Sequence, residues 1–304
     1  MKKMLCVVLM MVMLFAVAGA SEAQTKILKI GFSVNDFNDK WVSYVLDAVK
    51  AWDEARPDVE VVLGNSQTDV QKQMADVETW ITQKFDAICV KPVEVSATIV
   101  LANECKEAGI PYVAVQQPIK EATASCLQDS VRTGESQMQA VIDMLGGKGK
   151  VAILMGEPGT LVATQRIEGN KNILAKYPDV ELVVIEVANW QRDQGMKIME
   201  TWIQSGLKVD AIVASNDEAA IGAILALEAA GIRDKYIVAG IDATPDALKF
   251  MKEGRLDITM FADAKKLGEE SLNLAMKLIK EGKADDVVIS DLLVLPKDVD
   301  KYLK

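Results

Sequence analysis

Residues 211–242 read AIVASNDEAAIGAILALEAAGIRDKYIVAGID, and this stretch contains the same pattern twice. The apolar run Ala211–Val213 leads into Ser215-Asn216-Asp217, and the apolar run Ile237–Ala239 leads into Gly240-Ile241-Asp242. Each run is typical of a buried parallel strand, and a helical pattern follows each. The carboxyl ends of parallel strands form the edge at which open α/β sheets bind ligands. The stretch therefore predicts an α/β fold with a polar binding edge.

The same alternation extends to both sides of this stretch. Ile185-Glu186-Val187 leads into Asn189-Trp190-Gln191-Arg192 in the same way. In the second half we expect a helix over 133–145, strands over 151–155, 182–187, 211–214 and 237–241, and helices near 163–176, 191–205 and 217–230. In the first half we expect strands over 27–34, 59–63, 87–90 and 112–115, and helices over 40–55, 69–83 and 97–108. Right-handed βα crossovers place helices on both faces of a parallel sheet, so we predict two doubly wound lobes.

The composition excludes several classes of protein. The chain has 304 residues, which is about right for two domains of roughly 100–200 residues each. Its net charge of -10 argues against a nucleic-acid partner. The chain has no histidine, which removes Ser-His-Asp and Cys-His catalytic groups, and no CxxC motif that would suggest a zinc site. We therefore expect a binding protein rather than an enzyme, with neither catalytic residues, metal nor cofactor.

The N-terminus has the pattern of an export signal. Lys2 and Lys3 precede the apolar run Met4–Val17, and small residues follow in Ala18-Gly19-Ala20 and Ser21-Glu22-Ala23. The alternative is a membrane anchor, but the run is shorter than the roughly 20 residues that a spanning helix needs. We predict a cleaved signal peptide over residues 1–23 and a periplasmic mature protein.

Three cysteines remain in the mature chain. Cys89 lies in an apolar strand pattern, where a small buried thiol is expected. Cys105 and Cys126 could form a disulfide in an oxidising compartment, but the sequence does not give the distance between them. The state of this pair stays open at this point.

Five motifs occur in an order that is characteristic of one family: Phe37-Asn38-Asp39, Gly159-Thr160 with Arg166, 189–192, 215–218 and 240–246. Over essentially the whole mature chain, the sequence resembles periplasmic sugar-binding proteins of the ribose and galactose type. Residues 188–192 and 239–248 look most similar to the inositol- and rhizopine-binding branch.

The resemblance implies the fold of a type I periplasmic binding protein, in which three crossing strands join two lobes. The crossings would lie near Asp129, Asp263 and Ser290. The N-terminal lobe would comprise residues 24–129 plus 263–289, and the C-terminal lobe 130–262 plus 290–304. The resemblance further implies a monomer that delivers a clamped ligand to a membrane ABC permease, with a chemoreceptor as a further partner.

The resemblance also implies a set of ligand contacts. The first lobe would contribute Phe37, Asn38, Trp41, Gln116 and Gln117. The second lobe would contribute Arg166, Trp190, Asn216 and Asp242, and Asp263 would be either a ligand acceptor or a hinge residue. Sugars and cyclitols need bidentate polar groups for their hydroxyls and a flat aromatic face for their C–H side, and this set provides both.

The chain departs from the family pattern in two places. Gln116-Gln117 stands where the family commonly has an acid or amide followed by arginine, so a cation that grips ligand hydroxyls is missing there. Ala262 stands where many members have glutamine. The ligand is therefore expected to differ from that of the closest relatives.

Each of these residues also has a purely structural alternative. Arg166 could lie on a solvated helix face, although a cation early in a helix is disfavoured by about 0.3–1 kcal/mol. Asp242 could stabilise a turn, although Thr244 and Pro245 already supply the helix cap. Asn216 would make an ordinary helix cap. The remaining alternatives are a loop for Gln116 and Gln117 and an apolar core for Trp41 and Trp190.

Three kinds of function follow from these observations. The leading one is an exported protein that captures a sugar or an inositol-like cyclitol; a signalling molecule or another polyol is the alternative within the same fold. The second is an exported carbohydrate-active enzyme that uses a carboxylate pair such as Asp39 and Asp242. The third, a transcription regulator of the same fold, lacks a DNA-binding helix pair before Ile27.

Overall fold

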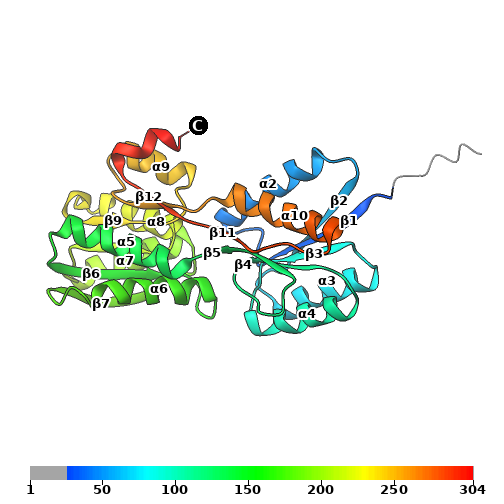
Figure 1. Ribbon diagram of the computed structural model, residues 1–304. Coiled ribbons are helices and arrows are strands. Elements are labelled where there is room, and N and C mark those ends of the chain that lie inside the picture. Colours follow the sequence, from blue (N-terminus) through cyan, green and yellow to red (C-terminus); the bar gives the residue numbers. More distant parts are fainter. Residues whose placement is uncertain (1–25, 304) are drawn as a thin grey trace, which may run out of the picture.

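The computed structural model describes residues 26–303 (Figure 1). The predicted signal peptide lies outside the described residues. Within the described part of the chain, none of the helices combines the length and the apolar character that crossing a membrane requires.

The first lobe is built on a six-stranded parallel sheet. Its strand order is β11-β5-β4-β3-β1-β2. The strands are β1 (Leu28–Val34), β2 (Val59–Asn65), β3 (Ala87–Val90), β4 (Tyr112–Gln116), β5 (Ala124–Gln128) and β11 (Val287–Ile289). Helices α2 (Lys40–Glu54) and α10 (Ala264–Glu281) pack together on one face, and α3 (Val70–Thr82) and α4 (Val95–Glu107) cover the other.

The second lobe is built on a four-stranded parallel sheet with the order β7-β6-β8-β9. The strands are β6 (Gly149–Met155), β7 (Val180–Val187), β8 (Ala211–Ala214) and β9 (Ile237–Ala239). Helices α5 (Ser130–Leu145) and α6 (Leu161–Leu174) cover one face, while α7 (Arg192–Ser205), α8 (Asp217–Ala229) and α9 (Pro245–Lys252) lie on the other. The predicted fold class, two α/β lobes with parallel sheets, is confirmed.

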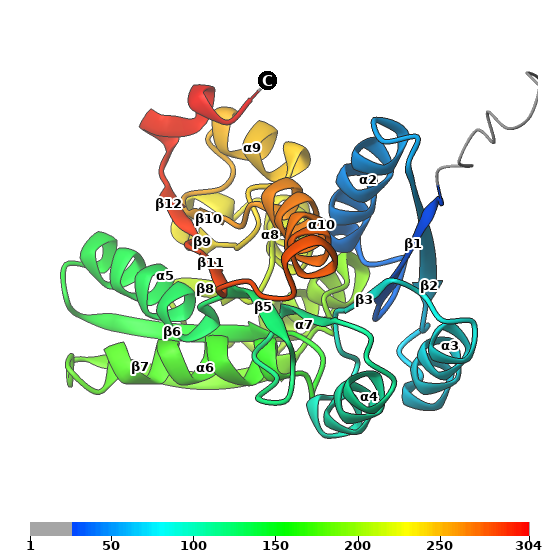
Figure 2. The ribbon, with the colours of Figure 1, turned by 45° about the vertical axis from the view of Figure 1, so that its right-hand side comes forward.

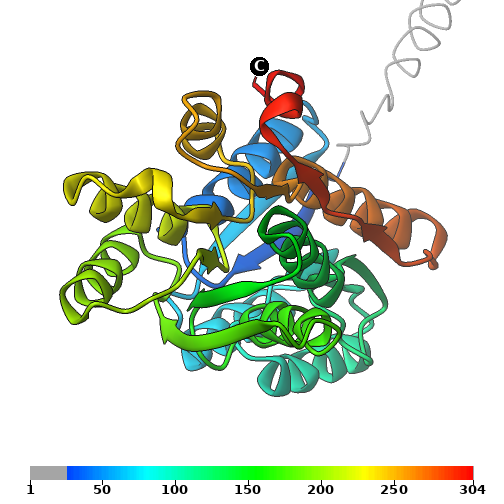
Figure 3. The same cartoon turned by 90° about the vertical axis from the view of Figure 1, so that its left-hand side faces the viewer.

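The chain passes between the two lobes three times (Figure 2). It crosses between β5 and α5, between β10 (Thr259–Phe261) and α10, and between β11 and β12 (Leu292–Val294). β10 and β12 pair antiparallel beside the second lobe, before the short helical turn η2 (Pro296–Lys301), and the turn η1 (Arg233–Lys235) precedes β9. Figure 3 views the molecule from the side of the second lobe, with the N-terminal strand behind it. The residue limits given above for the two lobes stay a prediction.

One predicted strand ends earlier than the sequence pattern indicates. Residues 237–241 form a strand only as far as Ala239. Beyond it, the N–H of Gly240 donates to the carbonyl of Ile258, and Asp242 adopts a φ of 123° that no regular strand allows. This turn ends the strand and directs Asp242 toward the gap between the lobes.

The three cysteines of the described chain are unpaired and buried. Cys105 belongs to the apolar core beneath α3 and α4, whereas Cys126 belongs to the core beneath α2 and α10. The two thiols therefore lie on opposite faces of the first sheet, and the disulfide that the sequence left open is not formed.

Candidate ligand-binding site

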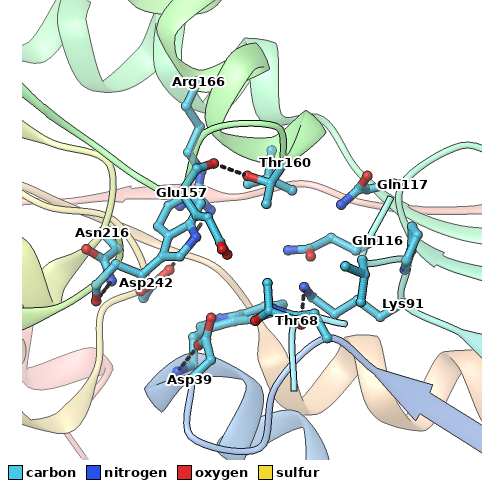
Figure 4. Close-up of a pocket in the computed structure, with 16 residues that line it drawn as sticks. Asp39, Thr68, Lys91, Gln116, Gln117, Glu157, Thr160, Arg166, Asn216 and Asp242 are labelled. Atoms are coloured by element: carbon cyan, nitrogen blue, oxygen red, sulfur yellow. Dashed lines mark hydrogen bonds and ion pairs between the residues drawn. The ribbon is translucent and has the colours of Figure 1, made fainter. Parts of the chain in front are cut away.

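A cavity lies between the two lobes, where the carboxyl ends of their parallel strands face each other (Figure 4). The space between its walls is about 560 Å³, including the part that opens to solvent. From the first lobe it is lined by Asn35, Asp39, Trp41, Thr68, Lys91, Pro92, Val93, Gln116 and Gln117. From the second lobe it is lined by Glu157, Thr160, Val162, Arg166, Trp190, Asn216 and Asp242.

Most of the predicted contact residues meet at this cavity. Those on its walls are Trp41, Gln116, Gln117, Arg166, Trp190, Asn216 and Asp242. They come from the first two turns of α2 and α6 and from the ends of β4, β7, β8 and β9. Trp190, Asn216 and Asp242 belong to the polar stretches that follow apolar runs, and the other four are positions that the family resemblance implies. Their roles as ligand contacts stay a prediction.

The other three predicted residues do not line the cavity. Phe37 packs against the first-lobe core, and its N–H donates to Asn65 Oδ1 at 3.2 Å. Asn38 is exposed. Asp263 accepts from the N–H of Lys266 and so caps α10, which fits the hinge alternative better than the ligand-acceptor alternative.

Arg166 is a buried cation in the second lobe's wall of the cavity. It lies in the second turn of α6, and only 5% of its surface is exposed. One guanidinium nitrogen donates to the carbonyl of Ser215, another lies 4.0 Å from Asp242 Oδ1, and the guanidinium carbon is 5.7 Å from the centre of the Trp190 ring. Nε is buried without a partner among the described residues. The side chain is therefore held in place, and its Nε is a buried donor without a partner in the described chain.

Two buried acidic residues interact at this wall: Asp242 lines the cavity, and Asp217 lies behind it. Burial raises the pKa of the Asp242 carboxyl well above its usual value, Arg166 opposes the rise, and Asp217 adds to it. Burial raises the pKa of Asp217 to about 7, against two stabilising contacts: the N–H of Thr244 and the hydroxyl of Thr259 donate to it at 2.8 and 2.7 Å. Asp217 ties the loops after β8 and β9 together, whereas Asp242 faces the cavity.

Asn216 caps a helix and also lies on the cavity wall. Its Oδ1 accepts from the N–H of Ala219 at 3.1 Å and caps α8, while its Nδ2 donates to the carbonyl of Trp190 at 3.0 Å. The helix-cap alternative is therefore correct, and the same side chain also lies on the cavity wall. Its second Nδ2 hydrogen is still available to a ligand.

The aromatic walls are fixed from behind. Trp41 Nε1 donates to the carbonyl of Ala262 at 2.9 Å, so the first-lobe ring is anchored to the second segment that crosses between the lobes. The Trp190 indole lies so close to Gly156 that a Cβ there would be 2.1 Å from the ring. Both rings are therefore held rigidly at the cavity, where either could cover the C–H face of a sugar or cyclitol.

Gln116 connects the cavity to the crossing strands. Its Nε2 donates to Gln128 Oε1 at 2.8 Å; the Nε2 of Gln128 donates to Asp291 Oδ1 at 3.1 Å, and the hydroxyl of Thr133 donates to Asp291 Oδ2 at 2.7 Å. These residues stand on β4, β5, the third crossing and α5. The side chain of Gln116 is therefore linked through hydrogen bonds to Thr133, near the start of the second lobe.

Residues with left-handed backbone conformations gather at the cavity. Thr68, Gln116, Trp190 and Asp242 have φ values of 58°, 69°, 65° and 123°, and all four line its walls. Such conformations cost of order 1–3 kcal/mol each in non-glycine residues and persist mainly where function requires them. The surrounding fold holds these side chains in place at a cost to stability.

The cavity opens toward an acidic rim. Asp36, Asp39, Glu157 and Asp193 surround the opening together with amide side chains and Trp190. Burial raises the pKa of Glu157, Lys91 lowers it, and the two aspartates of the first lobe raise it further. The rim disfavours anionic ligands and is compatible with uncharged ones.

Some wall residues were not among the predicted contacts. Asn35, Lys91 and Glu157 follow β1, β3 and β6, so the rule that identified Asn216 and Asp242 would also have found them. Thr68 has no such signal, because its position depends on the left-handed turn after β2. The strongest missed signal is Lys91, a charged residue directly after the wholly apolar strand 87–90.

The chain resembles known proteins over nearly its full length. A family profile described as the periplasmic binding protein domain matches residues 30–284. A candidate rhizopine-binding protein of Rhizobium meliloti is 36% identical over 87% of each chain, and the xylitol-binding protein of Mycolicibacterium smegmatis is 32% identical over 92% of this chain and 79% of its own. A solved ABC transporter solute-binding protein of Bacillus halodurans, with bound myo-inositol, is 39% identical, covers 92% of this chain and 99% of its own, and has a TM-score of 0.89. The resemblance identified from the sequence motifs is confirmed.

Proposed function

We infer the function of this protein from one premise: the chain belongs to the periplasmic binding protein family. We propose that it is exported, captures a sugar or an inositol-like cyclitol between its two lobes, and delivers it to an ABC permease in the membrane. Relatives that are binding proteins support this assignment, and the predicted signal peptide over residues 1–23 supports export.

One observation about the cavity carries the proposal. Gln116 Oε1 on the first lobe and Arg166 Nε on the second are buried without a hydrogen-bond partner among the described residues, and both side chains line the same cavity. An unpaired buried polar atom costs about 1–3 kcal/mol. A molecule with several hydroxyls can satisfy the acceptor and the donor at once, because each hydroxyl both donates and accepts.

The comparison with known structures favours a cyclitol within this class. The solute-binding protein with bound myo-inositol is 39% identical to this chain, and the rigid Trp41 and Trp190 rings suit a ring-shaped ligand. The xylitol-binding relative makes a linear polyol the alternative within the same chemistry.

The local contacts disfavour an exported carbohydrate-active enzyme. Asp39 Oδ1 accepts from the N–H groups of Trp41 and Val42 at 2.9 and 3.1 Å and so caps α2. Asp242 lies beside Arg166 in a buried setting. Neither carboxylate is placed as a free acid or base, so we propose a non-enzymatic role.

A thermal-shift screen tests the proposal. The panel comprises inositols, aminocyclitols, linear polyols, pentoses and hexoses, each added to the purified mature protein. A ligand present at a hundred times its dissociation constant stabilises the folded state by about 2.7 kcal/mol, so a true ligand raises the melting temperature. A folded protein whose melting temperature no panel member changes would contradict the proposal. Turnover of a panel sugar would favour the enzyme instead.

A further inference from the structure

Lys91 is a buried cation in the cavity wall that forms no ion pair among the described residues. Only 7% of its surface is exposed. Its Nζ donates to Asn35 Oδ1 at 2.7 Å, and no acidic side chain of residues 26–303 lies within salt-bridge distance. An ammonium group has three donors, so two remain without a protein partner in this part of the chain. Burying a charge is costly unless a partner compensates it.

The backbone around Lys91 is rigidly held. The N–H of Lys91 donates to the carbonyl of Ser33 at 2.8 Å, which extends the pairing of β3 with β1. The buried Gln73 donates to the carbonyl of Lys91 at 3.0 Å and accepts from the N–H of Val93 at 2.9 Å. Pro92 further restricts Lys91 to an extended conformation. The loop therefore presents the side chain in a fixed direction, and its ammonium end points into the cavity (Figure 4).

The charges around Lys91 indicate which ligand group it meets. Asp39 lies at the start of α2, Glu157 follows β6 and Arg166 lies on α6, and all three line the same cavity. The acidic rim opposes an anionic ligand, and the ammonium itself repels a cation placed directly against it. An uncharged hydroxyl oxygen is the acceptor that satisfies these constraints.

We propose that Lys91 is a ligand contact that determines specificity, donating hydrogen bonds from the first lobe to a hydroxyl oxygen of an uncharged polyol. This assignment rests on the proposed function and adds the residue that selects for a hydroxyl group at one ligand position. A polyol that lacks this hydroxyl leaves the ammonium buried without an acceptor, and sites of this kind reject such analogues strongly.

The role of Lys91 makes ligand binding depend on pH in a defined direction. Burial lowers the pKa of Lys91 to about 8; Asp39 and Glu157 raise it and Arg166 lowers it further. The charged form is the better donor, so ligand binding favours the protonated state. The contribution of Lys91 to affinity should therefore be complete well below pH 8 and be lost as the pH rises through 8. Because the pKa values of Asp217 and Asp242 are also raised, this contribution is measured as the difference between the pH profiles of wild type and Lys91→Met.

Isothermal titration calorimetry tests this assignment with the polyol that gives the largest thermal shift. Lys91→Met should bind it about tenfold to a hundredfold more weakly, the loss expected for a hydrogen bond from a charged donor. In a series of singly deoxygenated analogues, one analogue should bind to wild type much more weakly than the parent polyol does. Lys91→Met should bind that analogue and the parent polyol with nearly equal affinity. The matched control is Lys120→Met, an exposed lysine in the loop after β4, which should bind as wild type does.

The outcomes separate this assignment from the proposed function. Wild-type protein that binds no polyol would overturn both. Wild-type protein that binds every singly deoxygenated analogue as tightly as the parent polyol would overturn the role of Lys91 alone, and this measurement requires no variant to fold. Equal affinities of wild type and a folded Lys91→Met, with the same preference among the analogues, would also overturn it.

Discussion

Individual residues on the cavity wall combine complete burial with incomplete hydrogen bonding. Arg166, Gln116 and Lys91 are all buried, and each keeps a donor or an acceptor without a partner in the described chain. Folded proteins pair nearly all of their buried polar groups. Two of these atoms, Arg166 Nε and Gln116 Oε1, have no partner at all, and Lys91 Nζ has one partner for three donors. All three side chains line one cavity, where a bound molecule with several hydroxyls would complete their hydrogen bonding.

Replacing Arg166 tests the second lobe's share of this site. Arg166→Met keeps much of the side chain's length but removes every donor, so the polyol identified in the thermal screen should bind about tenfold to a hundredfold more weakly. Circular dichroism should remain that of a folded α/β protein. The control is Arg132→Met, because Arg132 is exposed on α5 and outside the cavity. Calorimetry that returns the wild-type affinity for a folded Arg166→Met would contradict the assignment.

The sequence predicts single residues well where a strand pattern places them. Asn216 and Asp242 directly follow apolar runs, and the structure brings both to the cavity. Phe37 and Asn38 belong to a motif of the family but lie in a loop, whose side-chain directions the sequence pattern does not fix. Thr68 reaches the wall only through a left-handed turn. Periodicity thus predicts residues at strand ends but not those that depend on loop geometry.

At the scale of elements, close helix contacts position the second lobe's wall. A Cβ at Gly134 on α5 would lie 2.2 Å from the carbonyl oxygen of Arg166 on α6. Gly169 on α6 lies equally close to α5, where a Cβ would be 2.1 Å from the carbonyl oxygen of Val131. The separation of the two helices, and with it the position of Arg166, therefore depends on glycine.

Adding one methyl group at this contact should be destabilising. Gly134→Ala improves intrinsic helix propensity by up to about 1 kcal/mol, but the clash is with backbone that cannot rotate away. We expect a net decrease of about 1–3 kcal/mol in the free energy of unfolding, measured by urea denaturation, and weaker polyol binding because α6 shifts. Ser136→Ala on the same helix is the control and should have little effect. A variant more stable than wild type would show that the helices adapt freely.

The predicted helices and longer strands agree with the structure because their signals are local. Asp69 and Thr244 cap helices, and Pro245 begins one, as their residue types favour. The three-residue strands β11 and β12 have no such signal: their partners, β5 and β10, lie far away along the chain or across a crossing. Pairing between distant segments determines these strands, so periodicity could not place them.

At the scale of the whole molecule, the crossings connect the cavity to both lobes. Trp41 donates to the backbone at the second crossing, and the hydrogen-bonded series from Gln116 through Gln128 to Asp291 reaches the third. Two side chains of the cavity wall are thereby linked to the segments about which two lobes of this kind would close. This arrangement is suited to retaining a small molecule and releasing it when the lobes separate.

The most direct measurement is a crystal structure of the mature protein with the polyol that gives the largest thermal shift. We predict one ligand molecule between the lobes, within hydrogen-bonding distance of Gln116 and Lys91 on one side and of Arg166 and Asp242 on the other. A ligand found elsewhere, or held by one lobe alone while the opposite wall stays out of reach, would contradict capture between the two lobes.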